Sequence, residues 1–220
     1  IQIKAEWIRT AVIYEQGGFW LDASMIINSN LQHWINHDSD FIGVRCPNEH
    51  CPKQIEDWMF GAPKNSPLIE KWLEEYEKAI QLGDQKYCDY VRDNKLVLSN
   101  YHSMPYLFHQ LSLMVVLERF NYDKENFQIL NSTENAFILL GKKKFRNCSF
   151  DNEGDLYILF IENRNKFPSP VYKITGWHRK TISKFLIIKY VNKNSIIGKL
   201  GLINNDNFIL NFFKYILAIF

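Results

Sequence analysis

The sequence predicts an α/β protein, and two observations carry this prediction. Short apolar runs alternate with amphipathic helical runs through the first half of the chain, an arrangement typical of a sheet covered by helices. The chain also has 220 residues, of which 46% are apolar and 15% aromatic. That content is sufficient for one well-packed domain with a small appendage. We expect the domain over residues 1–180 and a helical appendage over 181–220.

The first predicted helix covers residues 3–16. Apolar side chains recur there at helical spacing, namely at Ala5, Ile8, Val12 and Ile13, with Trp7, Ala11 and Tyr14 beside them. Gly17 is placed to cap the helix, because glycine tolerates the left-handed conformation. Residues 19–27 have β-rich composition and are predicted to form one strand.

The remaining elements follow similar signals. A helix is predicted to start after Ser66, with Pro67 in its first turn and Gly83 closing it. Another helix is predicted over 103–120. The other expected segments are a strand over 40–45, a loop over 46–52, an apolar segment over 57–63 that ends in a turn, strands over 136–141 and 155–162, and helices over 181–191 and near the carboxyl end.

The charge balance and the cysteine spacing argue against nucleic acid as a partner and against a structural zinc site. The 26 basic and 24 acidic residues give a net charge of +2, so nucleic acid is not an expected partner. The spacing of Cys46 and Cys51 lacks the second pair that structural zinc usually needs, which favours reduced thiols and a cytoplasmic location. The apolar stretch 208–220 is too short to span a membrane. It is expected to be a core helix or a peripheral contact with a membrane surface.

A carboxylate, Asp22, lies inside the predicted strand 19–27 and needs a positive partner, since burying it alone is costly. A buried arginine, a helix N-terminus or a metal ion would serve. Asp22 and Ser24 would share one face of a strand, where two oxygens can bind Mg²⁺ or Mn²⁺. The simpler interpretation is that Asp22 caps a turn or pairs with Arg45, and that Ser24 is an ordinary strand residue.

The run "AEWIRTAVIYEQGGFWLDASMI", residues 5–26, resembles the signature of the capsular polysaccharide synthesis protein family. That family is related to sugar-transferring enzymes with a DXD motif, including toxin-type glucosyltransferases. The matching pattern is an acid, an arginine three residues later, a helix, two glycines, two apolar residues and Leu-Asp, with Ser24 two residues after the aspartate. Weaker similarities in "EDWMFGAPKNSPLIEKWL", "YHSMPYLFHQLSLMV" and "VYKITGW" extend the resemblance to about Lys180.

The resemblance implies a GT-A-type domain, with a Rossmann-like sheet that binds a nucleotide sugar. In this family the strands that bind the base precede the arginine-bearing helix, so we expect a chain that lacks the first βα units. Site roles follow by resemblance. Donor-sugar binding would fall to Glu6, Arg9 and Trp20. Asp22 would be catalytic and would bind the metal or the ribose, and Ser24, where the motif has its second acid or threonine, would be a further metal ligand.

Two further candidates lie outside the signature. Asp57 could polarise the acceptor or orient a water, with a turn or helix cap as the simpler role. His178 could be a metal or phosphate ligand, with a surface histidine as the simpler interpretation. His102 and His109 are expected in the core or a pocket wall.

The expected function is transfer of a sugar from a nucleotide sugar, most simply a UDP-sugar, to a glycan or polysaccharide acceptor, with Mn²⁺ or Mg²⁺ as cofactor. The resemblance also implies retention of the anomeric configuration. The alternative is a catalytically inactive module that binds a glycan or a protein. A metal-dependent hydrolase would need more clustered carboxylates than the sequence shows.

Overall fold

The computed structural model describes residues 2–46, 54–97, 105–119, 126–138, 159, 169–176, 178, 194–195 and 198. Contacts divide the chain into two units. Unit 1 consists of Ile1–Asp22 and Ile35–Asn131, and unit 2 consists of Ala23–Trp34 and Ser132–Phe220.

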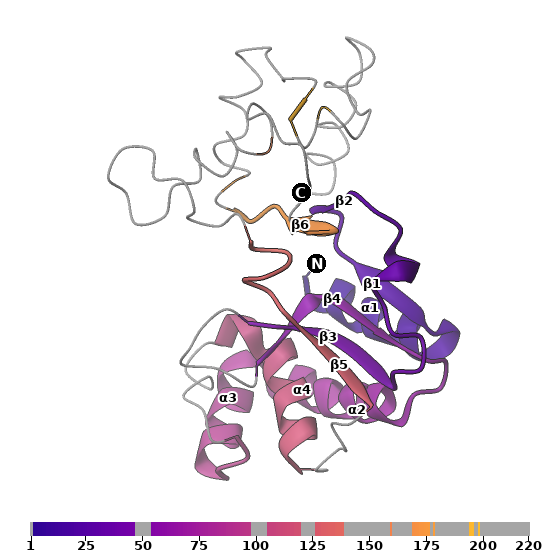
Figure 1. The fold of residues 1–220 in the computed structure, drawn as a ribbon. Coiled ribbons are helices and arrows are strands. Elements are labelled where there is room, and N and C mark those ends of the chain that lie inside the picture. Colours follow the sequence, from indigo (N-terminus) through magenta and orange to yellow (C-terminus); the bar gives the residue numbers. More distant parts are fainter. Residues whose placement is uncertain are drawn as a thin grey trace. The chain divides into compact units, whose positions relative to one another are not determined.

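Unit 1 is a mixed α/β unit, as the alternating sequence pattern predicted (Figure 1). Its sheet has the order β1-β4-β3-β5, in which β3 and β5 are parallel and the other pairs are antiparallel. Its elements are α1 (Gln2–Gln16), β1 (Gly18–Leu21), β3 (Phe41–Arg45), β4 (Ile55–Ala62), α2 (Pro67–Leu82), α3 (Asp84–Asp93), a 3-10 turn (Pro105–Leu107), α4 (Phe108–Arg119) and β5 (Phe127–Asn131).

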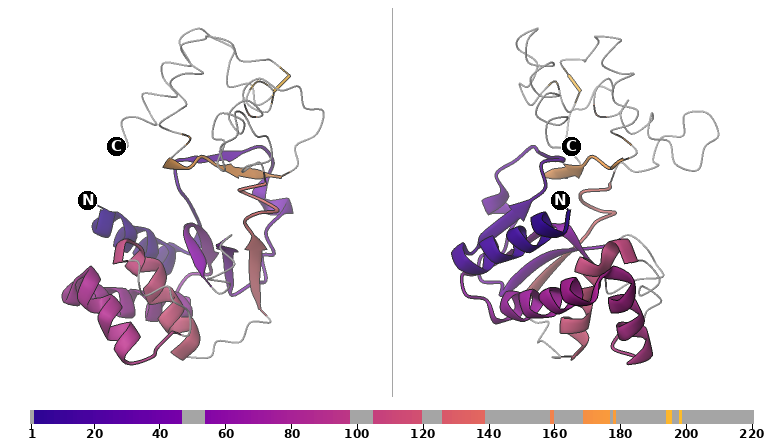
Figure 2. Two further views of the ribbon diagram at one scale, coloured as in Figure 1. Left: turned by 90° about the vertical axis from the view of Figure 1, so that its left-hand side faces the viewer. Right: turned by 180° about the vertical axis from the view of Figure 1, so that it is seen from behind.

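The helices of unit 1 lie on one side of its sheet (Figure 2). The space between helices and sheet is filled by aromatic and aliphatic side chains, the largest of them fully buried: Trp72, Tyr76, Tyr87, Phe41, Phe60 and Leu111. Trp72 of α2 packs edge-on against Phe60 of β4, with ring centroids 4.9 Å apart. The high aromatic content of the sequence therefore forms a core that fixes α2 and α4 against the central strand.

The junction of α1 and β1 depends on Gly17. The Gly17 N–H donates to the carbonyl of Ile13 at 2.8 Å, and the glycine has φ +69°. A Cβ at this position would lie 2.6 Å from the backbone nitrogen of Lys64. The predicted helix over 3–16 and its glycine cap are confirmed, and the close backbone approach adds a second reason for glycine here.

The prediction of one strand over 19–27 is wrong. β1 ends at Leu21, where the next N–H, that of Asp22, donates to the carbonyl of Trp58 at 2.9 Å. A turn follows, and β2 (Met25–Ile27) pairs with β6 (Val171–Lys173) in unit 2. The chain changes partner strands at this turn, so the alternation argument that put Asp22 and Ser24 on one strand face does not hold.

The predicted apolar stripe of the first helix is only partly buried. Ile8 and Val12 are 51% and 44% exposed, whereas Glu6 and Thr10 are buried with Ile13. The buried face of α1 is therefore largely polar, and the site described below explains why.

The helix after Ser66 is confirmed as α2, and Gly83 closes it with φ +81°. Ser66 makes no side-chain cap hydrogen bond. The predicted helix over 103–120 is shorter, since α4 begins at Phe108 after the 3-10 turn. No element was predicted at α3, β5 or β6.

Of the strand predicted over 136–141, residues 136–138 are in turns. The predictions for 155–162, 181–191 and 208–220 fall almost entirely outside the described residues.

Candidate active site

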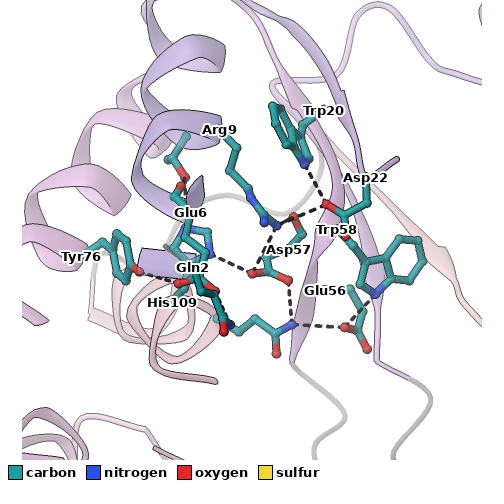
Figure 3. Close-up of polar contacts among 12 residues, drawn as sticks. Gln2, Glu6, Arg9, Trp20, Asp22, Glu56, Asp57, Trp58, Tyr76 and His109 are labelled. Carbon is teal, nitrogen blue, oxygen red and sulfur yellow. Dashed lines mark hydrogen bonds and ion pairs between the residues drawn. The ribbon is translucent and has the colours of Figure 1, made fainter. Parts of the chain in front are cut away.

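The guanidinium of Arg9 is the centre of a charged network in unit 1 (Figure 3). Arg9 lies on α1, and its Nη1 donates to the backbone carbonyl of Asp57 on β4 at 2.9 Å. The same nitrogen is 3.5 Å from Oδ1 of Asp22 and 3.6 Å from Oδ2 of Asp57. One cation therefore faces two carboxylates, which come from the end of β1 and from its neighbour β4.

Asp22, the carboxylate that the sequence left unexplained, is paired with this arginine. It lies directly after β1, and its Oδ1 also accepts a hydrogen bond from Nε1 of Trp20 at 3.1 Å. The Arg9 guanidinium carbon is 5.3 Å from the centre of the Trp20 ring, a cation–π distance. Of the partners that the sequence analysis considered, the structure places a buried arginine beside Asp22, and that arginine is Arg9.

Asp57 is held on all sides by partners from α1 and α4. Its Oδ2 lies 2.9 Å from Nδ1 of His109, and its Oδ1 accepts from Nε2 of Gln110 at 3.0 Å. Burial alone would raise the pKa of Asp57, but the hydrogen bond and charge of His109, the charge of Arg9 and the hydrogen bond of Gln110 outweigh it. The pKa of Asp57 is therefore held far below its usual range, and the side chain is an anion.

Glu56, next to Asp57 in β4, has the opposite tendency. Burial, and then the charge of Asp57, raise the pKa of Glu56, while hydrogen bonds from Cys46, Trp58 and Gln110 partly offset the rise. Trp58 donates to its Oε2 at 2.9 Å. Two adjacent carboxyl groups thus differ in their readiness to carry charge because only Asp57 faces Arg9 and His109.

Glu6 is the most deeply placed acid of the network and is 4% exposed. Its Oε2 accepts from the hydroxyl of Tyr76 at 2.5 Å, and its Oε1 accepts from Gln2 at 2.9 Å. Burial, together with the hydrogen bond and charge of Glu6, raises the pKa of Tyr76, so the hydroxyl stays a donor. Both oxygens of Glu6 are engaged by the protein.

Exposure divides the network into an open and a sealed side. The side chains of Asp22 and Asp57 are 27% and 15% exposed, whereas His109 is 1% exposed. A ligand therefore reaches Asp22 and the half-buried Trp20 more readily than Glu6 or His109.

A protein-family model described as "Capsular polysaccharide synthesis protein" matches residues 2–158, well over half of the chain. The chain belongs to this family. Comparison with curated proteins and with solved structures found no match. The match includes all the residues of the charged network, from Gln2 to Gln110.

In this capsular polysaccharide synthesis family member, each of the predicted cation ligands has a protein partner within the described residues. Nζ of Lys173 donates to Oγ of Ser24 at 2.8 Å, and an ammonium group there repels a cation on the same oxygen. Nδ1 of His178 accepts from the backbone N–H of Thr175 at 3.0 Å. Asp22 already faces Arg9. The positive charge beside Asp22 is thus supplied by a side chain.

The simpler interpretation of His178 as a surface histidine is wrong, because the residue is only 3% exposed. Ser24 and His178 both belong to unit 2.

No helix in the described part of the chain combines the length and apolar character needed to cross a bilayer.

Sequence reasoning missed several members of the network. Thr10, Tyr76 and Gln110 were not candidates, and His109 was expected only in the core or a pocket wall. The one usable signal was the placement of polar side chains on otherwise apolar helices. Buried polar groups need partners, and here they are partners of one another.

The low pKa of Asp57 predicts a pH-dependent stability. A carboxylate with a lowered pKa in the folded state stabilises the fold above its unfolded value of about 4, and this contribution is lost as the pH falls towards the folded value. The Asp57→Asn variant should therefore be less stable than wild type at pH 7, by a margin that shrinks at pH 3. Urea unfolding at both pH values measures the margin.

The exposed Asp93→Asn variant serves as the control, since Asp93 is paired only at the surface with Arg92. The pKa of Glu56 is raised, so its contribution to stability falls as the pH rises, opposite to that of Asp57. Glu56 therefore reduces the stability difference between wild type and Asp57→Asn but does not reverse it. A margin for Asp57→Asn that stays constant between pH 3 and pH 7 would contradict the prediction.

Proposed function

We propose that this protein is a glycosyltransferase that moves a sugar from a nucleotide-sugar donor to a glycan or polysaccharide acceptor. The family assignment supports a role in capsular polysaccharide synthesis. The observation that carries the finer proposal is the position of Arg9, held between Asp22 and Asp57 and beside the Trp20 ring. A GT-A-type donor site, implied by the resemblance, would use these groups.

The more exposed groups of the network, Asp22 and Trp20, have side chains of the kind that bind sugars. The Asp22 carboxylate accepts hydrogen bonds from sugar hydroxyls, and the Trp20 indole offers an apolar face to the C–H groups of a pyranose. The Arg9 guanidinium binds oxygen-rich groups in a fixed, planar geometry. Asp57 holds this arginine through its backbone carbonyl and its carboxylate, so we propose that Asp57 orients it, while Asp22, Trp20 and Arg9 contact the donor. Both carboxylate oxygens of Glu6 are bonded to Tyr76 and Gln2.

Positive charge is needed where the nucleoside diphosphate leaves, because negative charge develops there. The resemblance predicts Mn²⁺ or Mg²⁺ in that role. Because the predicted ligands Ser24 and His178 have local partners, we propose instead that Arg9 supplies positive charge near the donor. No step of the reaction is assigned to a metal ion.

Calorimetry of the full chain with UDP-glucose tests this function. We expect measurable binding in buffer with EDTA, and a loss of affinity of about tenfold in Asp22→Asn, since a hydrogen bond to a charged group contributes about 1.5–3 kcal/mol. Asp38→Asn, a change at an exposed acid outside the network, should bind as wild type does.

The results separate the candidate functions. Binding that appears only with Mn²⁺ would contradict the proposed role of Arg9 as the supplier of charge. If no UDP-, GDP- or dTDP-sugar binds with or without Mn²⁺, the glycosyltransferase proposal is wrong. The bond between Lys173 and Ser24 favours the alternative, a non-catalytic module, which predicts binding to capsular oligosaccharides that Asp22→Asn does not change.

A further inference from the structure

His109 lies where α4 meets both α1 and β4, and it links two members of the charged network. Its Nδ1 is 2.9 Å from Oδ2 of Asp57, and its Nε2 is 3.0 Å from Oγ1 of Thr10. The ring stacks on Trp72, with centroids 4.5 Å apart and planes inclined by 20°. Tyr76 meets it edge-on at 4.4 Å. Packing thus fixes the plane of the imidazole before any hydrogen bond is considered.

The proton positions follow from these partners. Asp57 is an anion, because its pKa is far below the usual range. An anionic oxygen at 2.9 Å requires a donor, so Nδ1 of His109 carries a proton. The Thr10 hydroxyl contacts Nε2 and also lies 3.0 Å from the carbonyl of Glu6 on the preceding turn. His109 is therefore bonded at both ring nitrogens.

The orientation of Asp57 determines the position of the Arg9 guanidinium. The carboxylate of Asp57 is turned towards His109 and Gln110, and its backbone carbonyl accepts from Nη1 of Arg9. Thr10 is the next residue after Arg9 on α1, so the second ring nitrogen of His109 holds the same helix turn. Two contacts, one on β4 and one on α1, thus fix the place of the guanidinium.

A metal ion is the competing use of these groups. Within the described residues, Glu6, Asp57 and His109 each place one ligand atom within 4.8 Å of the others. However, Nη1 of Arg9 already lies 3.6 Å from Oδ2 of Asp57, and the proton on Nδ1 occupies the lone pair that a metal would use. Both oxygens of Glu6 accept hydrogen bonds. The cluster is neutralised by protein groups.

We propose that His109 and Asp57 are positioning residues that hold the Arg9 guanidinium in the geometry required to bind the donor, an inference that rests on the proposed role of Arg9. His109 acts through Asp57, by way of Nδ1. Its contact with Thr10 through Nε2 is supporting.

Two substitutions at one position test which ring nitrogen matters. In His109→Asn the side-chain amide lies where Nδ1 was and can donate to Asp57. In His109→Gln the amide lies where Nε2 was and can reach only Thr10. Both remove the ring that packs on Trp72 and Tyr76, so both should lower the melting temperature by similar amounts. They form a matched pair that differs in the bond retained.

Two measurements on the full chain give the readout. The first is the dissociation constant for UDP-glucose, which we expect to stay within about threefold of wild type in His109→Asn and to rise about tenfold or more in His109→Gln. The second is the ¹⁵N–¹H signal of Nε of Arg9 in the free protein, assigned with Arg9→Lys. We expect it to keep its wild-type position in His109→Asn and to shift in His109→Gln.

The outcomes separate this inference from the proposed function. Equal loss of affinity in both variants, in proportion to their loss of stability, would show that His109 is a packing residue and would overturn the inference. Retention in His109→Gln alone would overturn the role of Asp57. If wild type binds no nucleotide sugar, the proposed function fails, while the Arg9 signal still decides whether His109 and Asp57 position the guanidinium.

Discussion

Replacing Arg9 with alanine should abolish donor binding and lower the free energy of unfolding by about 3 kcal/mol. The side chain is only 12% exposed and is the cation between Asp22 and Asp57. Removing one partner of a buried ion pair typically costs about 3–5 kcal/mol, because the remaining charge stays buried without compensation. We expect the lower end of that range, since Asp22 is 27% exposed and water screens part of its charge.

Urea unfolding and calorimetry with UDP-glucose, at a temperature where the variant is folded by circular dichroism, measure both effects. Arg92→Ala is a matched control, because Arg92 pairs with Asp89 and Asp93 at the surface and such pairs contribute about 1 kcal/mol or less. Adding Asp57→Asn to Arg9→Ala should recover part of the lost stability, as contacting residues are coupled. An Arg9→Ala cost no larger than that of Arg92→Ala would contradict the central role of this guanidinium.

The same residue shows what the sequence could and could not predict of the site. The spacing from Glu6 through Arg9 to Asp22 is local, and the helix and glycine turn that bring them together are encoded within 17 residues. Their resemblance to a family signature was therefore informative. The contacts of Asp57 with His109 and Gln110 join residues more than 50 positions apart, and no local pattern encodes such a pairing.

The fold shows the same division between local and distant signals. Proline and glycine placed the ends of α2, because their backbone preferences act at their own positions. The buried face of α1 was mispredicted, since apolar spacing favoured Ile8 and Val12. The face is instead selected by distant polar partners, Tyr76 for Glu6 and His109 for Thr10. The break at Asp22 was also hidden, because β1 and β2 are both β-rich and only their partner strands differ.

The turn between α1 and β1 is expected to be as sensitive as the charges that it positions. Gly17→Ala places a methyl group in a residue with φ +69° and 2.6 Å from the backbone nitrogen of Lys64. A non-glycine residue in the left-handed region already costs about 1–3 kcal/mol. Because the obstacle is backbone rather than a flexible side chain, the segment must move as well. We expect a total loss of about 3 kcal/mol or more.

Gly18→Ala is the matched control for this contact. Gly18 also has a positive φ, +99°, but no described atom lies within 4 Å of its added Cβ. Both variants place a residue with a side chain at positive φ, and only Gly17→Ala adds the backbone clash, so urea unfolding should show Gly17→Ala as the less stable. Equal losses would mean that the backbone conformation alone explains the need for glycine at this turn.

A movement at Gly17 also changes the site, because α1 carries Arg9 and β1 leads directly to Asp22. The Arg9–Asp22 separation of 3.5 Å spans this turn, so a shift of the helix relative to the strand lengthens it. We therefore expect Gly17→Ala to weaken UDP-glucose binding more than Gly18→Ala does, even at temperatures where both variants are folded. Equal affinities in the two variants would show instead that the site tolerates movement of α1, because Asp57 then holds Arg9 independently of the turn.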